Sequence, residues 1–227
     1  MLRDRSVIGT IGTASGETYS SRVFRHLEFL LGELSLRLED FDLFAVAAGP
    51  GSFTGLRVGL AAVKGWAEVF GKPIAAVSTL EAVAAQSRSR ANTVVAVMDA
   101  RRNELYWGIY RREESVEEAR FVLQGEERAG PREEFLRTIS RVETSEDLSI
   151  ATTAPELISA ALPEMALADE RAPRIEIQQV SPFLAPEIGQ LGWIQARNGK
   201  LADALTLDAN YIRRSDAELH SKGSAAS

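Results

Sequence analysis

The stretch that decides the fold of this chain runs Ala47-Ala48-Gly49-Pro50-Gly51-Ser52-Phe53-Thr54-Gly55-Leu56-Arg57-Val58-Gly59-Leu60. A short apolar run, 44–48, leads into it, and a long helical pattern follows. Gly49 and Gly51 can take positive φ, Pro50 stiffens the turn between them, and Ser52 or Thr54 can cap the helix. The stretch therefore predicts a strand, a tight glycine turn and a helix.

The same turn is a candidate anion site, because backbone N–H groups at a helix N-terminus attract negative groups. We interpret the following residues as nucleotide-binding candidates: Gly49, Pro50, Gly51, Ser52, Phe53, Thr54 and, from the second half of the chain, Asp99. The spacing leaves open the alternative of a plain strand-to-helix connection. It excludes a P-loop, since Lys72 and Lys200 lack the upstream glycine and the following hydroxyl. It also excludes the dinucleotide motif, since Thr54 stands in place of the third glycine.

Two helices of the first half carry more apolar surface than the core of one lobe should need. They are expected at residues 21–34 and 55–70, and Gly55 and Gly59 lie one turn apart on the second of them. We predict a partner interface and, in isolation, a homodimer through Arg22, Val23, Leu27, Leu30, Gly55, Leu56, Gly59, Leu60 and Val63. The alternative is that these residues pack only against the sheet. The pattern leaves open which of Val23, Phe24, Leu27, Leu60 and Val63 face the partner.

Composition narrows the class of protein. The 227 residues are 45% hydrophobic and 26% charged, as in ordinary globular chains. A net charge of −6 and a pI near 5.2 argue against a protein that wraps a nucleic acid by itself, but not against a subunit of a complex that does. There is no cysteine, no run of 18 apolar residues and no secretory pattern at the start, so we expect a cytoplasmic protein that does not cross a membrane.

The order of the predicted elements suggests two copies of one mixed α/β unit. Strands are expected at 7–13, 43–48, 74–77, 93–98, 104–110, 120–124, 148–152 and 174–178, with helices between them at 21–34, 55–70 and 78–87, from Pro131 and Pro155, and at 182–198. We therefore expect a first lobe at 1–91, a second at 92–214 and a disordered tail at 215–227. Two such lobes usually enclose a ligand cleft.

The chain lacks most of the side chains that catalysis would need. Its two histidines, His26 and His220, form no metal-binding spacing, so we predict no catalytic residue, no metal site and no cofactor. Asp99 is the best-placed carboxylate and could act near a phosphate or a metal; alternatively it bonds its own turn. Arg101 and Arg102 could hold an anion there, although a solvated turn is the commoner case. Glu126-Glu127-Arg128 is interpreted as solvated charge.

Several segments together resemble the bacterial TsaB (YeaZ-like) family. They are Ala48 to Gly59, Lys64-Gly65, Gly71-Lys72-Pro73, Val77 to Glu81, Met98 to Trp107 and Tyr211 to Glu218. They occur in the family's order from about residue 2 to 218. The resemblance implies a duplicated actin/Hsp70-like (ASKHA) two-lobed α/β fold.

The resemblance also implies a role in forming N6-threonylcarbamoyladenosine at position 37 of tRNA. In that pathway the paralogue TsaD carries the metal-binding histidines and the catalysis. A TsaB-like protein pairs with TsaD through its first-lobe helices, and the ATPase TsaE joins the complex. The TsaB-like subunit itself is expected to interact with tRNA only indirectly, through the complex. The residues leave open two other classes of protein, an active nucleotide-dependent transferase or phosphotransferase and a metalloprotease.

One departure from the family pattern concerns the start of the chain. Leu2 to Gly9 resembles the turn that leaves the family's second strand, so we expect the first lobe to lack about two N-terminal strands. The alternatives left open are a truncated chain, a misplaced start at Met1 and a genuinely reduced lobe. We expect an upstream in-frame segment ending in Asp-Thr-Ser or a near variant. We also expect the 227 residues alone to be poorly soluble or unstable, because unpaired strand edges aggregate.

Overall fold

The computed structural model describes residues 1–13, 19–113, 120–142, 147–159, 175–210 and 212. It separates into two compact units, one of Met1–Ser78 with Ile188–Ser227 and one of Thr79–Glu187. This division differs from the boundary expected at residues 91 and 92, because the helix at Thr79–Ala85 contacts the strands of the second unit. Most of the last helix, in turn, belongs to the first unit. The expected tail at 215–227 lies outside the described residues.

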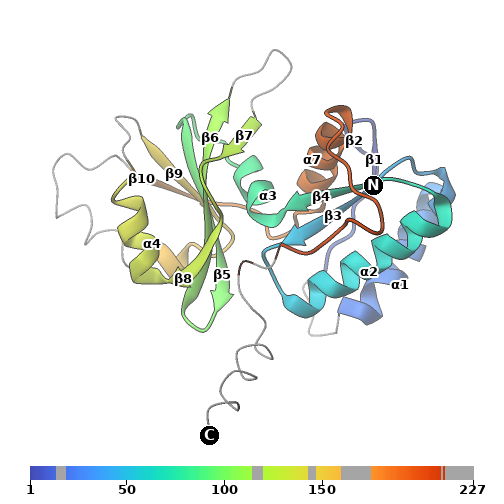
Figure 1. The fold of residues 1–227 in the computed structure, drawn as a ribbon, viewed down its shortest axis with the longest axis horizontal. Helices are drawn as coiled ribbons and strands as arrows, with labels where there is room; N and C mark the ends of the chain where they lie inside the picture. Colours follow the sequence, from blue (N-terminus) through green and yellow to red (C-terminus); the bar gives the residue numbers. More distant parts are fainter. Residues whose placement is uncertain (14–18, 114–119, 143–146, 160–174, 211, 213–227) are drawn as a thin grey trace, which may run out of the picture. The chain divides into compact units, whose positions relative to one another are not determined.

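The first unit is built on two parallel strands, β3 (Phe44–Gly49) and β4 (Ile74–Ser78). A short antiparallel pair, β1 (Leu2–Arg3) with β2 (Ser6–Val7), precedes them. The helices are α1 (Tyr19–Leu34), α2 (Phe53–Phe70) and α7 (Ala185–Arg197), with a 3-10 turn at Leu38–Asp40 (Figure 1).

Helices cover both faces of the β3–β4 pair, because side chains alternate along a strand. On one face Phe44 and Ile74 pack with Leu60, Val63 and Ala67 of α2. On the other face α7 approaches so closely that a Cβ at Gly192 would lie 2.7 Å from the Cβ of Ala45. Glycine is therefore required at this helix position. The result is three layers, with α2 and α7 on opposite sides of the strands (Figure 1).

A segment near the C-terminus completes the first unit. The N–H and C=O groups of Ala202 bond the C=O and N–H of Ile74, at 2.8 and 2.9 Å. Further along, the N–H of Asn210 donates to the C=O of Ala48 at 2.7 Å, and Leu207 is buried in the core between these points. Residues 200 to 210 thus connect the start of β4 to the end of β3.

The second unit is a six-stranded sheet of order β10-β9-β5-β6-β7, in which β8 also pairs with β6. Its strands are β5 (Thr93–Arg101), β6 (Glu104–Glu113), β7 (Arg120–Leu123), β8 (Arg128–Pro131), β9 (Leu148–Thr152) and β10 (Ile175–Gln179). β10, β9 and β5 run parallel, and the pairs that β6 forms are antiparallel.

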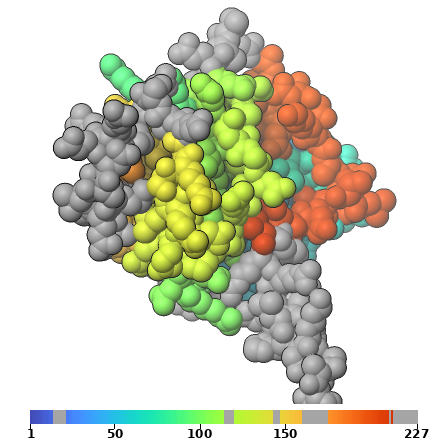
Figure 2. Space-filling view, turned by 60° about the vertical axis from the view of Figure 1, so that its left-hand side comes forward, coloured from blue at the N-terminus to red at the C-terminus, as the bar shows by residue number. Residues whose placement is uncertain are grey.

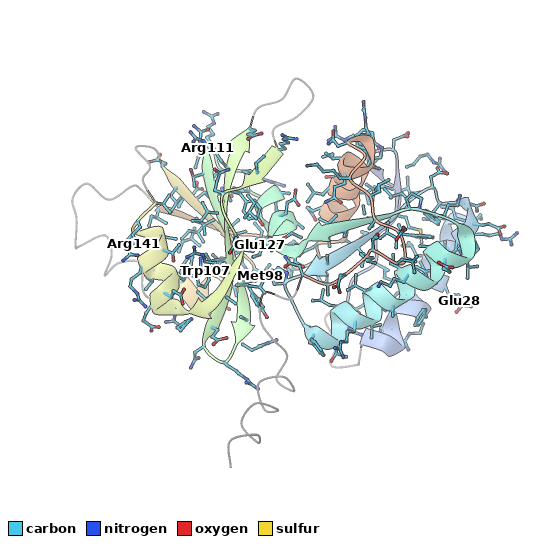
Figure 3. The ribbon with its side chains drawn as sticks, viewed as in Figure 1. Glu28, Met98, Trp107, Arg111, Glu127 and Arg141 are labelled. Carbon is cyan, nitrogen blue, oxygen red and sulfur yellow. The ribbon has the colours of Figure 1, made fainter. Side chains whose placement is uncertain are left out.

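Helices flank this sheet on both sides. α3 (Thr79–Ala85) lies on one face, and α4 (Arg132–Ile139) and the short α5 (Glu156–Ser159) lie on the other (Figure 1). Figure 2 shows α4, in yellow, packed closely against the green strands of its own unit. The core there centres on Trp107, whose ring meets that of Phe135 edge-on at 5.8 Å and which lies on the α4 side of the sheet (Figure 3).

Most predicted elements of both units are present, and the differences are local. The strand expected at 7–13 is wrong, because β2 ends at Val7 and the next described residues form no strand. α1 begins at Tyr19, two residues before the expected start at residue 21. β8 was not predicted, since its sequence, Arg-Ala-Gly-Pro, lacks the apolar alternation of a strand. Among the described residues, no helix combines the length and apolarity needed to cross a bilayer.

Candidate functional site

The glycine turn has the predicted order of strand, turn and helix. β3 ends at Gly49, whose φ is +119°, a value that side-chain-bearing residues rarely adopt. A Cβ on Gly49 would lie 2.6 Å from the backbone oxygen of Asn210. Both the backbone angle and the close approach of another chain segment therefore demand glycine at this position. A Cβ on Gly51, by contrast, would meet nothing within 4 Å.

Ser52 is the residue that caps α2. Its Oγ accepts a hydrogen bond from the N–H of Gly55 at 3.4 Å, and its C=O accepts from the N–H of Leu56 at 2.8 Å. Thr54 lies inside the helix, so of the two predicted caps Ser52 is confirmed. The guanidinium of Arg57 stacks over the ring of Phe53 with its central carbon 3.8 Å from the centroid. This end of α2 thus combines the positive end of the helix dipole with an arginine.

Asp99 lies near the end of a strand of the second unit. It belongs to β5, opposite Leu105 of β6, in the second unit, whereas the glycine turn belongs to the first. Its Oδ1 accepts the N–H of Arg101 at 2.7 Å, and its Oδ2 lies 3.4 Å from an Nη of the same residue. The carboxylate is thus occupied by its own turn, which is the alternative that the sequence left open.

The β5–β6 connection explains why Asp99 is held in this way. Arg101, Arg102 and Asn103 all have positive φ, at 65°, 55° and 61°. Three consecutive residues in this region are unusual without glycine, and each costs backbone energy. The bond from the Arg101 N–H to Asp99 compensates part of that cost at the register shift between the two strands.

The residues proposed for a partner interface fall into a buried group and a half-buried group. Leu56, Leu60 and Val63 are buried on the face of α2 that meets the sheet, and Gly59 faces Val46 of β3. In this chain they contribute to the core rather than to an exposed surface, because positions 56, 60, 63 and 67 repeat with the helical period. Val23, Leu27, Leu30, Gly55 and Arg22 are half-buried.

Three other large apolar side chains of these helices are exposed to solvent. Phe24, Phe29 and Val69 are 51%, 58% and 75% exposed. Phe24 also meets the ring of Trp66 edge-on, with centroids 6.3 Å apart, so it bridges α1 and α2. The sequence signal for Phe29 was its position away from the main apolar stripe of α1. We call Phe24, Phe29 and Val69 the exposed helix patch.

Sequence reasoning missed two further residues. Asn210 contacts the glycine turn, yet it lies 161 positions after Gly49 in the sequence, and no local pattern predicts such a contact. Glu127, interpreted as solvated charge, is half-buried and accepts the hydroxyl of the buried Tyr110 at 2.6 Å. Its neighbours in sequence are charged, which is why the burial was not predicted.

The described residues offer no evident metal centre. Within them, no group of three or more histidine, cysteine, aspartate or glutamate side chains could hold a metal ion. What the site can offer chemically is the capped N-terminus of α2 with its open Gly51 and the Phe53–Arg57 stack, an arrangement suited to an anionic group.

Comparison with known proteins defines the class first. The solved structure of YeaZ from Pseudomonas aeruginosa is similar over 85% of this chain and 83% of its own length, with a TM-score of 0.63 and 28% identity. A second structure, described as an uncharacterized protein with similarity to the peptidase YeaZ from the same organism, matches with a TM-score of 0.62 and 27% identity over the same shares. The chain therefore has the duplicated, actin/Hsp70-like α/β fold that the family resemblance implied.

The family follows from sequence comparison. A family model described as TsaD, tRNA N6-adenosine threonylcarbamoyltransferase, matches residues 6–126, and relatives named TsaB match about half of the chain. The chain belongs to this TsaD family and, within it, to the TsaB (YeaZ-like) proteins. It is 35% identical over 111 residues to the tRNA threonylcarbamoyladenosine biosynthesis protein TsaB of Bacillus subtilis, and 35% identical over 114 residues to TsaB of Escherichia coli. These matches span 48% and 49% of the relatives, so the chain covers about half the length of the curated relatives it matches.

Proposed function

We propose that this protein is a non-catalytic partner subunit in the formation of N6-threonylcarbamoyladenosine at position 37 of tRNA, and that it binds and activates a TsaD-type catalytic paralogue. The observation that carries the proposal is the 35% identity to proteins named for that biosynthesis. A TsaE-type ATPase would join through the complex, tRNA would be handled by the assembly, and the protein would act in the cytoplasm.

The census of reactive groups supports a non-catalytic role. The whole sequence has two histidines and no cysteine, and the described residues contain no cluster able to ligate a metal. Asp99, the best-placed carboxylate, is already bonded to the backbone of its own turn. A subunit that relies on its paralogue for the chemistry needs none of these groups.

The exposed helix patch supports association with another protein. Phe24, Phe29 and Val69 leave large apolar side chains in water on two neighbouring helices, and such surfaces mark contact sites. In the complex this patch would contact the paralogue. In its absence the same patch would pair with a second copy, giving a homodimer that competes with the paralogue.

The test is an affinity measurement with the TsaD-type paralogue from the same organism. We expect Phe29→Ala to weaken binding about thirtyfold, the effect of losing roughly 2 kcal/mol at an interface hot spot. Phe183→Ala is the matched control, because Phe183 is 49% exposed but belongs to the other unit. Both variants should melt like the parent, since neither side chain is in the core.

Two results would contradict the proposal. One is the absence of binding between the parent chain and the paralogue. The other is failure of the chain, supplied with any residues that its gene encodes upstream, to restore tRNA modification in a strain depleted of its own TsaB. If the chain binds but Phe29→Ala and Phe183→Ala behave alike, the complex stands and the exposed helix patch is the wrong surface.

A second candidate function rests on the glycine turn. An open Gly51 beside a capped helix N-terminus favours an anionic ligand, so a nucleotide-dependent transferase or phosphotransferase is the alternative. ATP binding and turnover by the isolated chain distinguish the two. Robust turnover that disappears in Asp99→Ala would favour the enzyme over the partner subunit.

A further inference from the structure

Arginines gather at one end of the sheet in the second unit, far from the β5–β6 turn. Arg88 and Arg90 are exposed on the segment that leads into β5, and Arg111 is exposed near the end of β6, where Figure 3 shows it. Arg111 pairs in register with Thr93, the first residue of β5. We call Arg88, Arg90 and Arg111 the arginine cluster.

The segment that carries Arg88 and Arg90 is held in place by buried polar side chains. Ser87 Oγ donates to Gln178 Oε1 at 3.0 Å, and the Arg88 N–H donates to the same oxygen at 3.0 Å. Ser89 Oγ donates to Glu176 Oε2 at 2.8 Å. Because Ser87 and Ser89 are anchored inward on β10, the two arginines between and beyond them point to solvent.

Arg112 ties this segment to β6. Its guanidinium donates to the C=O of Ser89 and lies over the ring of Phe121, 5.1 Å from the centroid. Its N–H donates to the C=O of Asn92 at 2.7 Å. The backbone beneath the arginine cluster is therefore ordered before any ligand arrives, which lowers the entropic cost of binding.

The charges of the cluster are not neutralised by the residues that the structure describes. Arg120, on β7, pairs with Glu113 at 3.1 Å, but no described residue forms an ion pair with Arg88, Arg90 or Arg111. The sequence also contains Glu114, Glu117 and Glu118, which lie outside the described residues. Exposed arginines on a rigid support suit phosphates, which they can bind in a bidentate manner.

We propose that the arginine cluster contacts the phosphate backbone of RNA, and that in the assembled complex it helps to hold the tRNA. This inference rests on the proposed function for the identity of the RNA, and it replaces a purely indirect role in tRNA binding with a direct, auxiliary one. With the net charge of −6 the contact is weak by itself. Phosphate contacts position a nucleic acid and do not read its sequence, so the cluster should bind other RNAs equally well.

The experiment measures the affinity for an unmodified tRNA transcript across a range of salt concentrations, with the chain alone and in complex with the paralogue. In the triple variant R88Q/R90Q/R111Q the slope of log K against log salt should become less steep by about 2 to 3, since each phosphate contact contributes roughly 0.7 to 0.9 to its magnitude. Affinity at low salt should fall severalfold. Arg112 is kept, because it supports Ser89 and Phe121.

The matched control is R132Q/R137Q/R141Q, which removes three charges on and just after α4 in the same unit; Figure 3 marks Arg141 there. It should leave the salt slope unchanged. Circular dichroism melting of both triple variants checks that the fold is intact.

Each outcome decides the inference. An unchanged slope in the first triple variant, or a parent chain with no salt-dependent RNA binding in either state, overturns it. Tighter binding of polyglutamate than of the tRNA at equal charge concentration overturns RNA in favour of an acidic protein partner. If the parent chain does not bind the paralogue, the proposed function is refuted instead. The salt slope of RNA binding by the chain alone then still tests the arginine cluster.

Discussion

Replacing Gly49 by alanine tests the packing of the glycine turn against the C-terminal segment. The residue has a φ of +119°, and a Cβ there would lie 2.6 Å from the backbone oxygen of Asn210. Holding a side-chain-bearing residue at such an angle costs about 1–3 kcal/mol. Pushing a backbone segment aside costs about 1–3 kcal/mol more, as in an overpacked core. We therefore expect the free energy of unfolding to fall by about 2–6 kcal/mol, a large part of the roughly 5–15 kcal/mol of a typical domain.

Gly51→Ala is the matched control, because it lies two residues away and its Cβ would meet nothing within 4 Å. It should change the free energy of unfolding by less than about 1 kcal/mol in either direction. Urea denaturation followed by circular dichroism gives both values on the same scale. If Gly49→Ala and Gly51→Ala differ by less than about 0.5 kcal/mol, the contact with Asn210 does not constrain the turn and the reasoning is wrong.

Three further changes test individual contacts. Ser52→Ala should lower the free energy of unfolding by about 0.5–2 kcal/mol, and because the bond to the Gly55 N–H is long, at 3.4 Å, we expect the lower half of that range in urea denaturation. Hydrogen bonds from the backbone and side chain of Thr206 lower the pKa of Asp203 below its ordinary value, so its stabilising effect should be present above about pH 4 and be lost as the pH falls; Asp203→Asn should flatten the acid limb of a stability–pH profile, and an unchanged limb would contradict this. Trp107→Ala should cost about 3–5 kcal/mol through the cavity it leaves among buried side chains, and a loss below about 1 kcal/mol would mean that the core of the second unit collapses around it.

Local patterns predicted the elements whose signals are short-range. The apolar strands β4 and β9 and the Ser52 cap of α2 follow from neighbouring residues, and the structure has them where the pattern put them. The helical period of α2 also indicates which of its residues face the core, since positions 56, 60 and 63 repeat on one face. The sequence analysis did not assign these residues to the core, because both faces of this helix are apolar.

Contacts between distant segments were not predictable in the same way. The strand β8 and the Tyr110–Glu127 hydrogen bond were both missed from the sequence. Burial of a carboxylate such as Glu127 depends on a partner from another strand, which the neighbouring residues do not reveal. Asp99 illustrates the converse. Its sequence position suits a ligand or a turn equally, and the structure shows the local turn bond, with the Arg101 N–H donating to Asp99 at 2.7 Å beside the register shift between β5 and β6.

The sequence by itself determined the glycine turn, the α/β class and the family, because each depends on residue types at short, fixed spacings. Only the tertiary structure decided which chain segments share a unit. α7 and residues 200 to 210 join the first strands because Gly192 admits the helix onto Ala45 and because Ala202 pairs with Ile74. Such contacts link residues more than a hundred positions apart. Their energy comes from surfaces that exist only once the chain has folded, and no local pattern encodes which surface meets which.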